Sequence, residues 1–318
     1  MWDLPGVLKH FVLARTGTTG VVPYSGHLSP WLLAMLSAFP FMRLGYRPFI
    51  SRRGRALGLA LAKPRRETDQ IDLAWLLVRP VGRDGPKVRA PRDVVSELLD
   101  AVCRCSAEAG IVSVFARLPE GCGFVGEFSQ YGFIVVAREH TYGLTANGSP
   151  EPVEVEGMRS QEKSDAWGVQ QLYRSFTPVA VQRAENLTSR TWELPKRRGL
   201  GLGRGDGRYD SFVVDGKNGI DAWLRIESED GAPCRISLMV NPTRRGLAPE
   251  MIDFALEWLS NVPGLNAVTT VRDYETGLLK GLQESGFRPT HSRLLMVKHL
   301  GIRFKEPIAE PALERVGS

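Results

Sequence analysis

The same order of apolar and polar segments occurs twice along the chain, over residues 57–142 and 220–300. Each stretch opens with two apolar runs separated by a short polar segment. The runs are Leu57–Ala62 and Ile71–Val78 in the first stretch, and Ile220–Ile226 and Arg235–Val240 in the second. Apolar runs of this length on either side of a polar turn predict β-hairpins.

Each predicted hairpin is followed by a polar loop and a helix that starts with Ala-Pro, at Ala90-Pro91 and Ala248-Pro249. Proline suits the first helical position, where its missing N–H has no partner in any case. Apolar residues then recur with a helical period, which predicts that one face of each helix packs on a sheet.

A strand, a second helix and a last strand complete each stretch. The two helices end in Gly-Phe, at Gly132-Phe133 and Gly286-Phe287, where glycine suits the left-handed residue after a helix. The strands are expected at Ile111–Ala116 and Ile134–Tyr142, and at Ala267–Val271 and Leu294–Leu300. Because the order of the elements, their spacing and the Ala-Pro and Gly-Phe pairs agree throughout, we interpret the two stretches as copies of one α/β unit.

The remaining segments join or precede these copies. Thr145–Pro152 is rich in turn-forming residues and predicts a linker, whereas the glycine-rich Gly199–Gly207 predicts a loop that could cover a ligand. Helices are expected at Ser29–Phe39, Lys163–Phe176 and Val179–Trp192, and a strand at Glu154–Met158.

Composition places the chain among globular proteins, with 43% hydrophobic and 24% charged residues in 318. The longest apolar stretch, Leu28–Leu44, is interrupted by two prolines and Arg43, so no membrane span and no signal peptide are expected. We expect a cytoplasmic protein with four free cysteines and no metal site, since no cysteine or histidine has ligand spacing.

The positive charge of the chain is unevenly distributed. Eight lysines and arginines and no acidic residue occur between Arg43 and Arg66, within a formal net charge of +6. Basic clusters of this kind suit ligands that carry phosphate.

The order of elements resembles the GNAT superfamily of acyl-CoA-dependent N-acyltransferases. The resemblance implies an α/β (α+β) fold of two tandem GNAT-like domains, each a mixed, mostly antiparallel twisted sheet flanked by helices. The expected boundaries are residues 1–145 for the N-terminal domain, 153–302 for the C-terminal domain and 303–318 for a tail.

The family's phosphate-binding loop follows the fourth strand and reads Gln or Arg, two residues, Gly, one residue, then Gly or Ala. The second copy reads Thr243-Arg244-Arg245-Gly246-Leu247-Ala248, which matches at Gly246 and Ala248 and departs at Thr243. Backbone N–H groups that open a helix attract anions, and two arginines add charge. An ordinary strand-to-helix turn, with Gly246 chosen for its backbone angles, is the alternative interpretation.

The resemblance also implies that the backbone amides of Leu238, Met239 and Val240 hold the acyl carbonyl of acetyl-CoA or another acyl-CoA. In the first copy, Val88 stands where Gly246 stands in the second. A β-branched residue would crowd an approaching phosphate, so the cofactor loop of the first copy is interpreted as degenerate.

The family's usual general acid is a tyrosine four residues before the Gly-Phe glycine. Leu282 and Phe128 occupy that position here, and neither can donate a proton. Tyr274, after the strand beside the expected cleft, is nominated as a substitute acid, and Glu227, at the hairpin, as a base.

The leading functional hypothesis is an acetyl-CoA-dependent N-acyltransferase whose acceptor is a small-molecule or peptide amine. It is slightly favoured over a catalytically inactive tandem GNAT-like protein that binds a ligand or a partner. Transfer from an aminoacyl-tRNA ranks third, and nucleic acid is not the expected partner.

Overall fold

The computed structural model describes residues 19–22, 45–53, 56–65, 68–80, 89–145, 154–194, 208–228, 233–260 and 266–301. The predicted helix Ser29–Phe39, the loop Gly199–Gly207 and Val88 lie outside these residues. Among the described helices, none combines the length and the apolar character needed to span a bilayer. The four cysteines are free, as expected.

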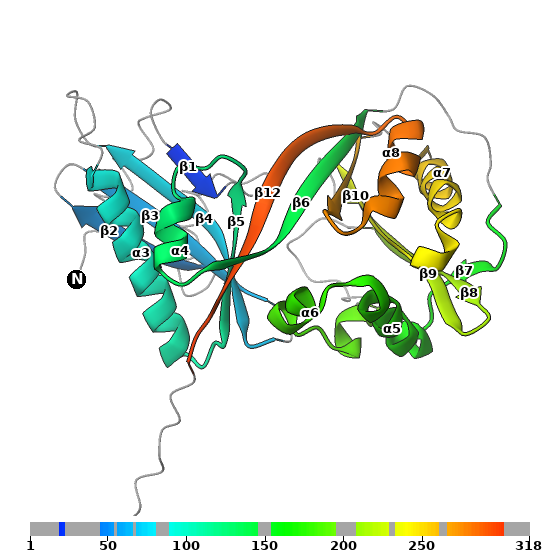
Figure 1. The fold of residues 1–318 in the computed structure, drawn as a ribbon, viewed down its shortest axis with the longest axis horizontal. Helices are drawn as coiled ribbons and strands as arrows, with labels where there is room; N and C mark the ends of the chain where they lie inside the picture. The colour runs from blue at the N-terminus through cyan, green and yellow to red at the C-terminus, as the bar shows by residue number, and fades with distance from the viewer. Residues whose placement is uncertain are drawn as a thin grey trace, which may run out of the picture.

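Within this part of the chain, twelve strands form one mixed sheet in the order β2-β3-β4-β5-β12-β6-β11-β10-β9-β8-β7, with β1 paired to β4 (Figure 1). The strands are β1 Thr19–Val22, β2 Arg47–Arg53, β3 Ala56–Pro64, β4 Gln70–Pro80, β5 Ser113–Pro119, β6 Ile134–Thr145, β7 Met158–Ser160, β8 Arg208–Gly216, β9 Gly219–Ser228, β10 Cys234–Val240, β11 Asn266–Arg272 and β12 Arg288–His299. The pairs β4–β5 and β10–β11 are parallel, and the other pairs are antiparallel.

The described helices are α3 Arg89–Glu108, α4 Val125–Gln130, α5 Ala166–Phe176, α6 Val179–Glu185, α7 Leu247–Ser260 and α8 Leu279–Glu284. Short 3-10 turns are η1 Lys163–Asp165, η2 Ser189–Trp192, η3 Pro242–Arg244 and η4 Thr276–Leu278. The order strand, strand, helix, strand, helix, strand is the same for β3-β4-α3-β5-α4-β6 as for β9-β10-α7-β11-α8-β12. Gly132 and Gly286 have φ of 81° and 85°, which confirms the left-handed residue predicted after α4 and α8.

Some predicted elements differ in extent. The expected helix Val179–Trp192 is divided into α6 and η2 because Asn186 ends α6 in the left-handed conformation, at φ 46°. The expected strand Glu154–Met158 begins only at Met158, after a turn in which Gly157 has φ 75°. β12 begins at Arg288 rather than Leu294. Its first residues are mostly polar and exposed, so the apolar pattern of the sequence did not include them.

The last strands of the two halves are exchanged. β12 pairs with β5 of the first half, whereas β6 pairs with β11 of the second half, and β6 and β12 also pair with each other. Met296 of β12 therefore belongs to the core around α3, and Tyr142 of β6 belongs to the core around α7. Figure 1 shows these two strands running side by side from one half to the other.

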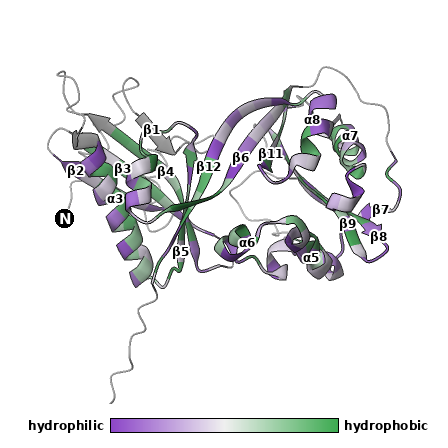
Figure 2. Ribbon diagram, in the orientation of Figure 1, coloured by the Kyte–Doolittle hydropathy of each residue, from purple (hydrophilic) through white to green (hydrophobic). Residues whose placement is uncertain are grey.

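The helices cover opposite faces of the sheet. On one face α3 and α7 bury alternate apolar residues of their hairpins, such as Leu224 and Leu238 under α7, and the outward side of α3 is hydrophilic (Figure 2). On the other face α5 packs on Trp223 and Met239, and α6 packs on Phe115 and neighbouring strand residues. The α5–α6 face is continuous across both halves because the sheet is continuous.

Candidate functional site

A pocket opens where β10 separates from β11. Their parallel pairing joins Cys234–Ile236 to residues 267–269 and goes no further. The pocket holds about 440 Å³, part of it open to solvent. It is lined by Phe176, Leu238, Met239, Val240, Pro242, Arg245, Ala248, Tyr274, Glu275, Thr276, Gly277 and Leu278. The backbone of the last three residues of β10 thus borders the pocket along the side that carries no paired strand in the described structure.

The loop that follows β10 is fixed by its own side chains. The Oδ1 atom of Asn241 accepts hydrogen bonds from the N–H of Thr243 at 3.1 Å and from its hydroxyl at 2.9 Å. The Nδ2 atom of Asn241 donates to Asp221 on β9 at 3.1 Å. These bonds anchor the turn η3, from which the chain enters α7 at Leu247 with its N-terminal amides beside the pocket.

Gly246 lies at the start of α7 and has no packing or conformational need to be glycine. Its φ is not positive, and a Cβ atom built on it would meet no heavy atom within 4 Å. The interpretation that Gly246 is required by its backbone angles is therefore wrong. The space above it is free for a ligand that approaches the backbone closely.

The two arginines of the loop have different surroundings. Arg244 lies 3.7 Å from a carboxylate oxygen of Asp221, with 54% of its side chain exposed. Arg245 packs across Gly277, where a Cβ atom would lie 3.5 Å from its Cγ atom, and it borders the pocket. Within the described residues Arg245 forms no ion pair, so its charge is available to an anionic ligand.

The opposite wall of the pocket is the tight turn after β11. Oε2 of Glu275 accepts a hydrogen bond from the backbone N–H of Arg272 at 2.7 Å. Burial raises the pKa of Glu275 to about 7, against the lowering effects of that hydrogen bond and of the Arg272 charge. A carboxyl group with this pKa exchanges a proton near neutral pH, as a general base or acid must.

Tyr274 also lies on this turn, and its hydroxyl oxygen accepts a hydrogen bond from Nη1 of Arg272 at 2.9 Å. Burial raises the pKa of Tyr274 to about 12, although the neighbouring Arg272 charge lowers it. The phenol therefore keeps its proton at neutral pH and can donate it.

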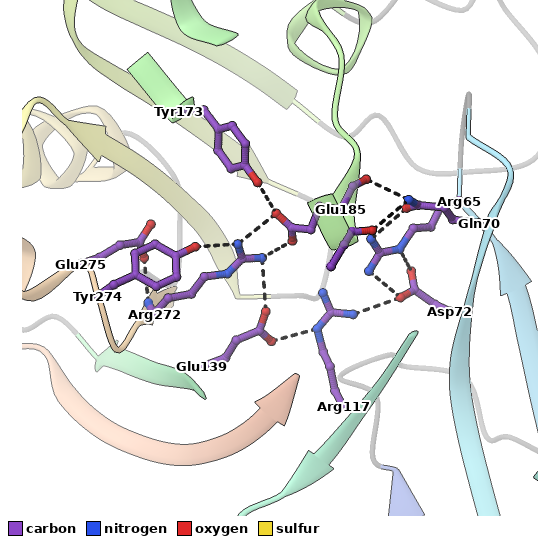
Figure 3. Close-up of polar contacts among 11 residues, drawn as sticks. Arg65, Gln70, Asp72, Arg117, Glu139, Tyr173, Glu185, Arg272, Tyr274 and Glu275 are labelled. Atoms are coloured by element: carbon purple, nitrogen blue, oxygen red, sulfur yellow. Dashed lines mark hydrogen bonds and ion pairs between the residues drawn. The ribbon is translucent and has the colours of Figure 1, made fainter. Parts of the chain in front are cut away.

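A buried ion network continues from Arg272 into the first half of the chain (Figure 3). Arg272 binds both carboxylate oxygens of Glu185, at the end of α6, and Glu185 also accepts from the Tyr173 hydroxyl at 2.7 Å. Arg272 also lies 3.6 Å from Glu139 on β6. The network therefore fixes the turn that carries Tyr274 and Glu275.

Within the first half the network includes Arg117, which donates to Glu139 at 2.8 Å and to Asp72 at 3.1 Å. Arg65 closes it with two further bonds to Asp72, at 3.0 and 2.8 Å. Gln70 on β4 donates to the backbone carbonyl of Glu185 at 2.9 Å, so the first half also holds the end of α6. Three arginines thus meet three carboxylates, so each of these charges has partners of opposite sign, as buried charges require.

Most of the residues nominated from sequence meet at this one pocket. Leu238, Met239, Val240, Arg245, Ala248 and Tyr274 line it, Gly246 and Arg244 lie on the adjoining loop, and Leu247 is buried beside Ala248 in α7. Glu227 lies away from the pocket, because it is opposite Arg235 at the other end of the β9–β10 ladder. Leu282 and Phe128, which stand where the resemblance implies a tyrosine, are buried in the two main cores.

The corresponding edge in the first half is covered. There β4 pairs with β5 only over Gln70–Leu73, yet β1 pairs with the next part of β4, with Thr19 opposite Val78 and Gly20 opposite Leu77. Strand β1 thus occupies the position that the pocket occupies in the second half. Strand β1 is therefore a second obstacle to cofactor binding in the first half, in addition to the bulk of Val88 that the sequence predicts.

Sequence reasoning missed Phe176, Glu185 and the network behind Arg272. Glu275 was not nominated either. Its signal was position alone, directly after the strand that borders the cleft.

Comparisons with known proteins bear on the fold. No protein-family model and no curated protein matches the sequence. Among solved structures, a GCN5-related N-acetyltransferase from Sphaerobacter thermophilus is 12% identical, with a TM-score of 0.50 over 79% of this chain and 82% of its own. A tandem GNAT protein from the clavulanic acid biosynthesis pathway is 14% identical, with a TM-score of 0.51 over 94% and 95% of the two chains. The chain has a GNAT-like fold.

Proposed function

We propose that this protein is an N-acyltransferase that binds acetyl-CoA or another acyl-CoA in its second half and acylates an amine. The observation that carries the proposal is the separation of β10 from β11 after Ile236, which leaves the backbone of Leu238–Val240 beside a pocket. Free main-chain groups of a strand can hold the amide groups of an extended ligand by adding to the sheet edge.

The residues present fit the diphosphate part of such a ligand. Gly246 leaves room for close approach to the backbone, and the N-terminal amides of α7 favour negative charge. Arg245 adds a guanidinium without an ion pair among the described residues, and Arg244 adds an exposed one. The loop would therefore bind the diphosphate, and β10 the acyl-bearing arm.

When bound, acyl-CoA would supply an acyl group activated as a thioester, whose transfer breaks a C–S bond and forms a C–N bond. Glu275 would accept the proton that the attacking amine loses, since its pKa of about 7 leaves a large ionised fraction at neutral pH. Tyr274 would donate a proton to the departing sulfur. Arg272 and Glu185 would position both residues by fixing the turn after β11.

We also infer that the chain consists of two tandem GNAT-like domains, residues 1–145 and 153–302, with a tail at 303–318. The repeated element order supports this division. Each domain would be completed by the other's last strand, since β12 lies against β5 and β6 against β11. In this arrangement the first domain would bind no cofactor and would hold α6 and the ion network in place.

Calorimetric titration with acetyl-CoA and with CoA tests the proposal. We expect saturable binding that is at least tenfold weaker in the Gly246→Val variant, because the new side chain fills the space above the loop. Gly123→Val is the matched control, since Gly123 is also exposed, has no positive φ, and would place its Cβ atom in open space. Absence of binding to the wild-type protein would overturn the proposal.

A second candidate function is a GNAT-like protein that binds a ligand without turnover. It is favoured by the burial of Leu282 and Phe128 where the family has its acid. A screen of amine acceptors with acetyl-CoA separates the two functions, because release of free CoA that depends on the acceptor shows turnover.

A further inference from the structure

Three arginines that the proposed function does not use lie on the α5–α6 face of the sheet, beyond the part that α5 covers. They are Arg225 on β9, Arg235 on β10 and Arg293 on β12. Arg225 lies opposite Ser237 in the β9–β10 ladder, and Arg235 lies opposite Glu227. Residues opposite each other share a face, so Arg225 and Arg235 are diagonal neighbours on it.

Two aromatic rings hold the guanidinium of Arg225, and two of its nitrogen atoms lack a hydrogen-bond partner in the described part of the chain. Its guanidinium carbon lies 4.7 Å from the ring centroid of Trp223 and 4.9 Å from that of Tyr209. Its Nε and Nη2 atoms are buried and have no hydrogen-bond partner within the described part of the chain. Burial lowers the pKa of Arg225. A buried donor without a partner costs roughly 1–3 kcal/mol, so two on one guanidinium call for an explanation.

Arg293 is also partly buried and stands among like charges. Burial lowers the pKa of Arg293, and so do the charges of Arg117 and Arg235, although Glu139 raises it. The carboxylate of Glu139 is already engaged by Arg117 and lies near Arg272. Within the described residues Arg293 forms no ion pair of its own, and neither does Arg235.

The surrounding strand residues are polar as well. Thr141 on β6 and Thr270 on β11 lie opposite each other on the same face, with their hydroxyl oxygens 3.3 Å apart. Figure 2 shows that the parts of β6 and β12 that join the two halves are largely hydrophilic. Glu227 is the acidic residue next to Arg235, and it forms no ion pair within the described structure. The face therefore has an excess of positive charge.

This basic face adjoins the pocket. Ser237, opposite Arg225, directly precedes Leu238, which lines the pocket. Met239, two residues further along β10, lies on the same face as Ser237, at a separation of about 7 Å along the strand. A small molecule with an acidic group and an amine can span such a distance.

We propose that Arg225, Arg235 and Arg293 bind the carboxylate or phosphate group of the acceptor, so that the substrate is an amine that also carries an acidic group. The inference rests on the proposed function, since it names the acceptor of that same site. A guanidinium presents two parallel N–H donors to a carboxylate or phosphate, and Nε and Nη2 of Arg225 form such a fork. Binding there would satisfy both donors of Arg225 and relieve the repulsion between Arg235 and Arg293.

Anion binding can be measured without acyl transfer. Inorganic phosphate and succinate, titrated at constant ionic strength, are expected to change the tryptophan fluorescence, because Trp223 stacks on Arg225. We expect saturable binding that is at least tenfold weaker in Arg225→Lys, which keeps the charge but loses the fork, and in Arg235→Gln. Arg104→Gln is the control, since Arg104 is exposed on α3 and pairs with Asp100. Equal anion affinity in all four proteins would overturn the anion site.

The acceptor is then tested with matched pairs of amines: phenylalanine and phenethylamine, lysine and cadaverine, phosphoethanolamine and ethanolamine. Acetylation is expected to favour the acid-bearing member by at least tenfold in kcat/KM, and Arg293→Gln and Arg235→Gln are expected to reduce that preference without changing the KM for acetyl-CoA. The carboxylate and phosphate pairs show which acid is preferred.

The acceptor assignment and the proposed function would be contradicted by different results. If acetyl-CoA binds and plain amines are acetylated as fast as the acid-bearing ones, the acceptor assignment is wrong and the proposed function stands. If acetyl-CoA does not bind at all, the proposed function is wrong and the acceptor assignment falls with it, whatever the anion titration gives.

Discussion

Nη1 of Arg272 donates a hydrogen bond to the hydroxyl oxygen of Tyr274, and the two atoms are 2.9 Å apart. Because the oxygen accepts from Arg272, the phenolic proton can point elsewhere, including into the pocket that Tyr274 lines. The same guanidinium binds Glu185 of α6. The candidate acid is thus oriented by a residue that is itself fixed by an ion network shared between the two halves.

Replacing Tyr274→Phe removes this proton donor and keeps the ring. We expect kcat for acetyl transfer to fall by about 10²–10⁴-fold, the range for loss of a general acid, with little change in the Kd for acetyl-CoA. Steady-state kinetics and calorimetry on the same preparations measure both. Tyr131→Phe is the control, because Tyr131 lies at the end of α4, against Lys298. An unchanged kcat would exclude Tyr274 as the acid.

The Glu185→Gln variant is expected to destabilise the protein. It leaves Arg272 buried with one charged partner fewer, and breaking a buried pair costs about 3–5 kcal/mol. The free energy of unfolding from urea titration measures the loss. Glu284→Gln, which breaks an exposed pair with Lys280 on α8, is expected to change stability by only about 0–1 kcal/mol. Equal effects of the two variants would contradict a structural role for the network.

Each chain is expected to bind one molecule of acetyl-CoA. Strand β1 pairs with β4 at Leu76–Val78, the segment that corresponds to Leu238–Val240 in the second half. The edge that would receive a second acyl-CoA is therefore already paired. Calorimetry gives the stoichiometry directly, and a value of two per chain would contradict this interpretation of the asymmetry.

Residues typical of helix starts and helix ends predicted the repeated elements and the position of the loop. Ala248-Pro249 marks the start of α7 within one residue, and Gly132 and Gly286 have the left-handed conformation expected of them. These features depend on neighbouring residues, so a single sequence contains them.

The exchange of β6 and β12 and the ion network could not be predicted in this way. Alternation of apolar residues shows which side of a strand is buried, but not which strand lies beside it. Arg272 and Glu185 are far apart in the chain, and each resembles an ordinary surface charge until α6 folds over the sheet. Glu227 was nominated from its place at a hairpin, and the register of β9 with β10 sets it at the end away from the pocket.

Ionisation of Glu275 is expected to make the stability of the protein depend on pH. Burial raises its pKa to about 7 from the usual value of 4.5, with the nearby carboxylates Glu139 and Glu185 raising it further and Arg272 lowering it. Between these two pH values the folded protein holds a proton that the unfolded chain has lost, so this group makes the protein less stable as pH rises. The full difference, reached above pH of about 7, is roughly 3 kcal/mol.

The Glu275→Gln variant carries no charge there at any pH. We therefore expect its free energy of unfolding, relative to wild type, to increase between about pH 5 and pH 8, because the ionised carboxylate penalises only the wild type. Comparing the two proteins cancels the contributions of the other carboxyl groups, whose lowered pKa values act in the opposite direction. We also expect the wild-type kcat/KM to rise through about pH 7 as the base ionises in the free protein, and the variant to have a lower kcat/KM without this rise. A stability difference that does not change with pH would contradict the raised pKa, and a variant with the wild-type pH–rate profile would exclude Glu275 as the base.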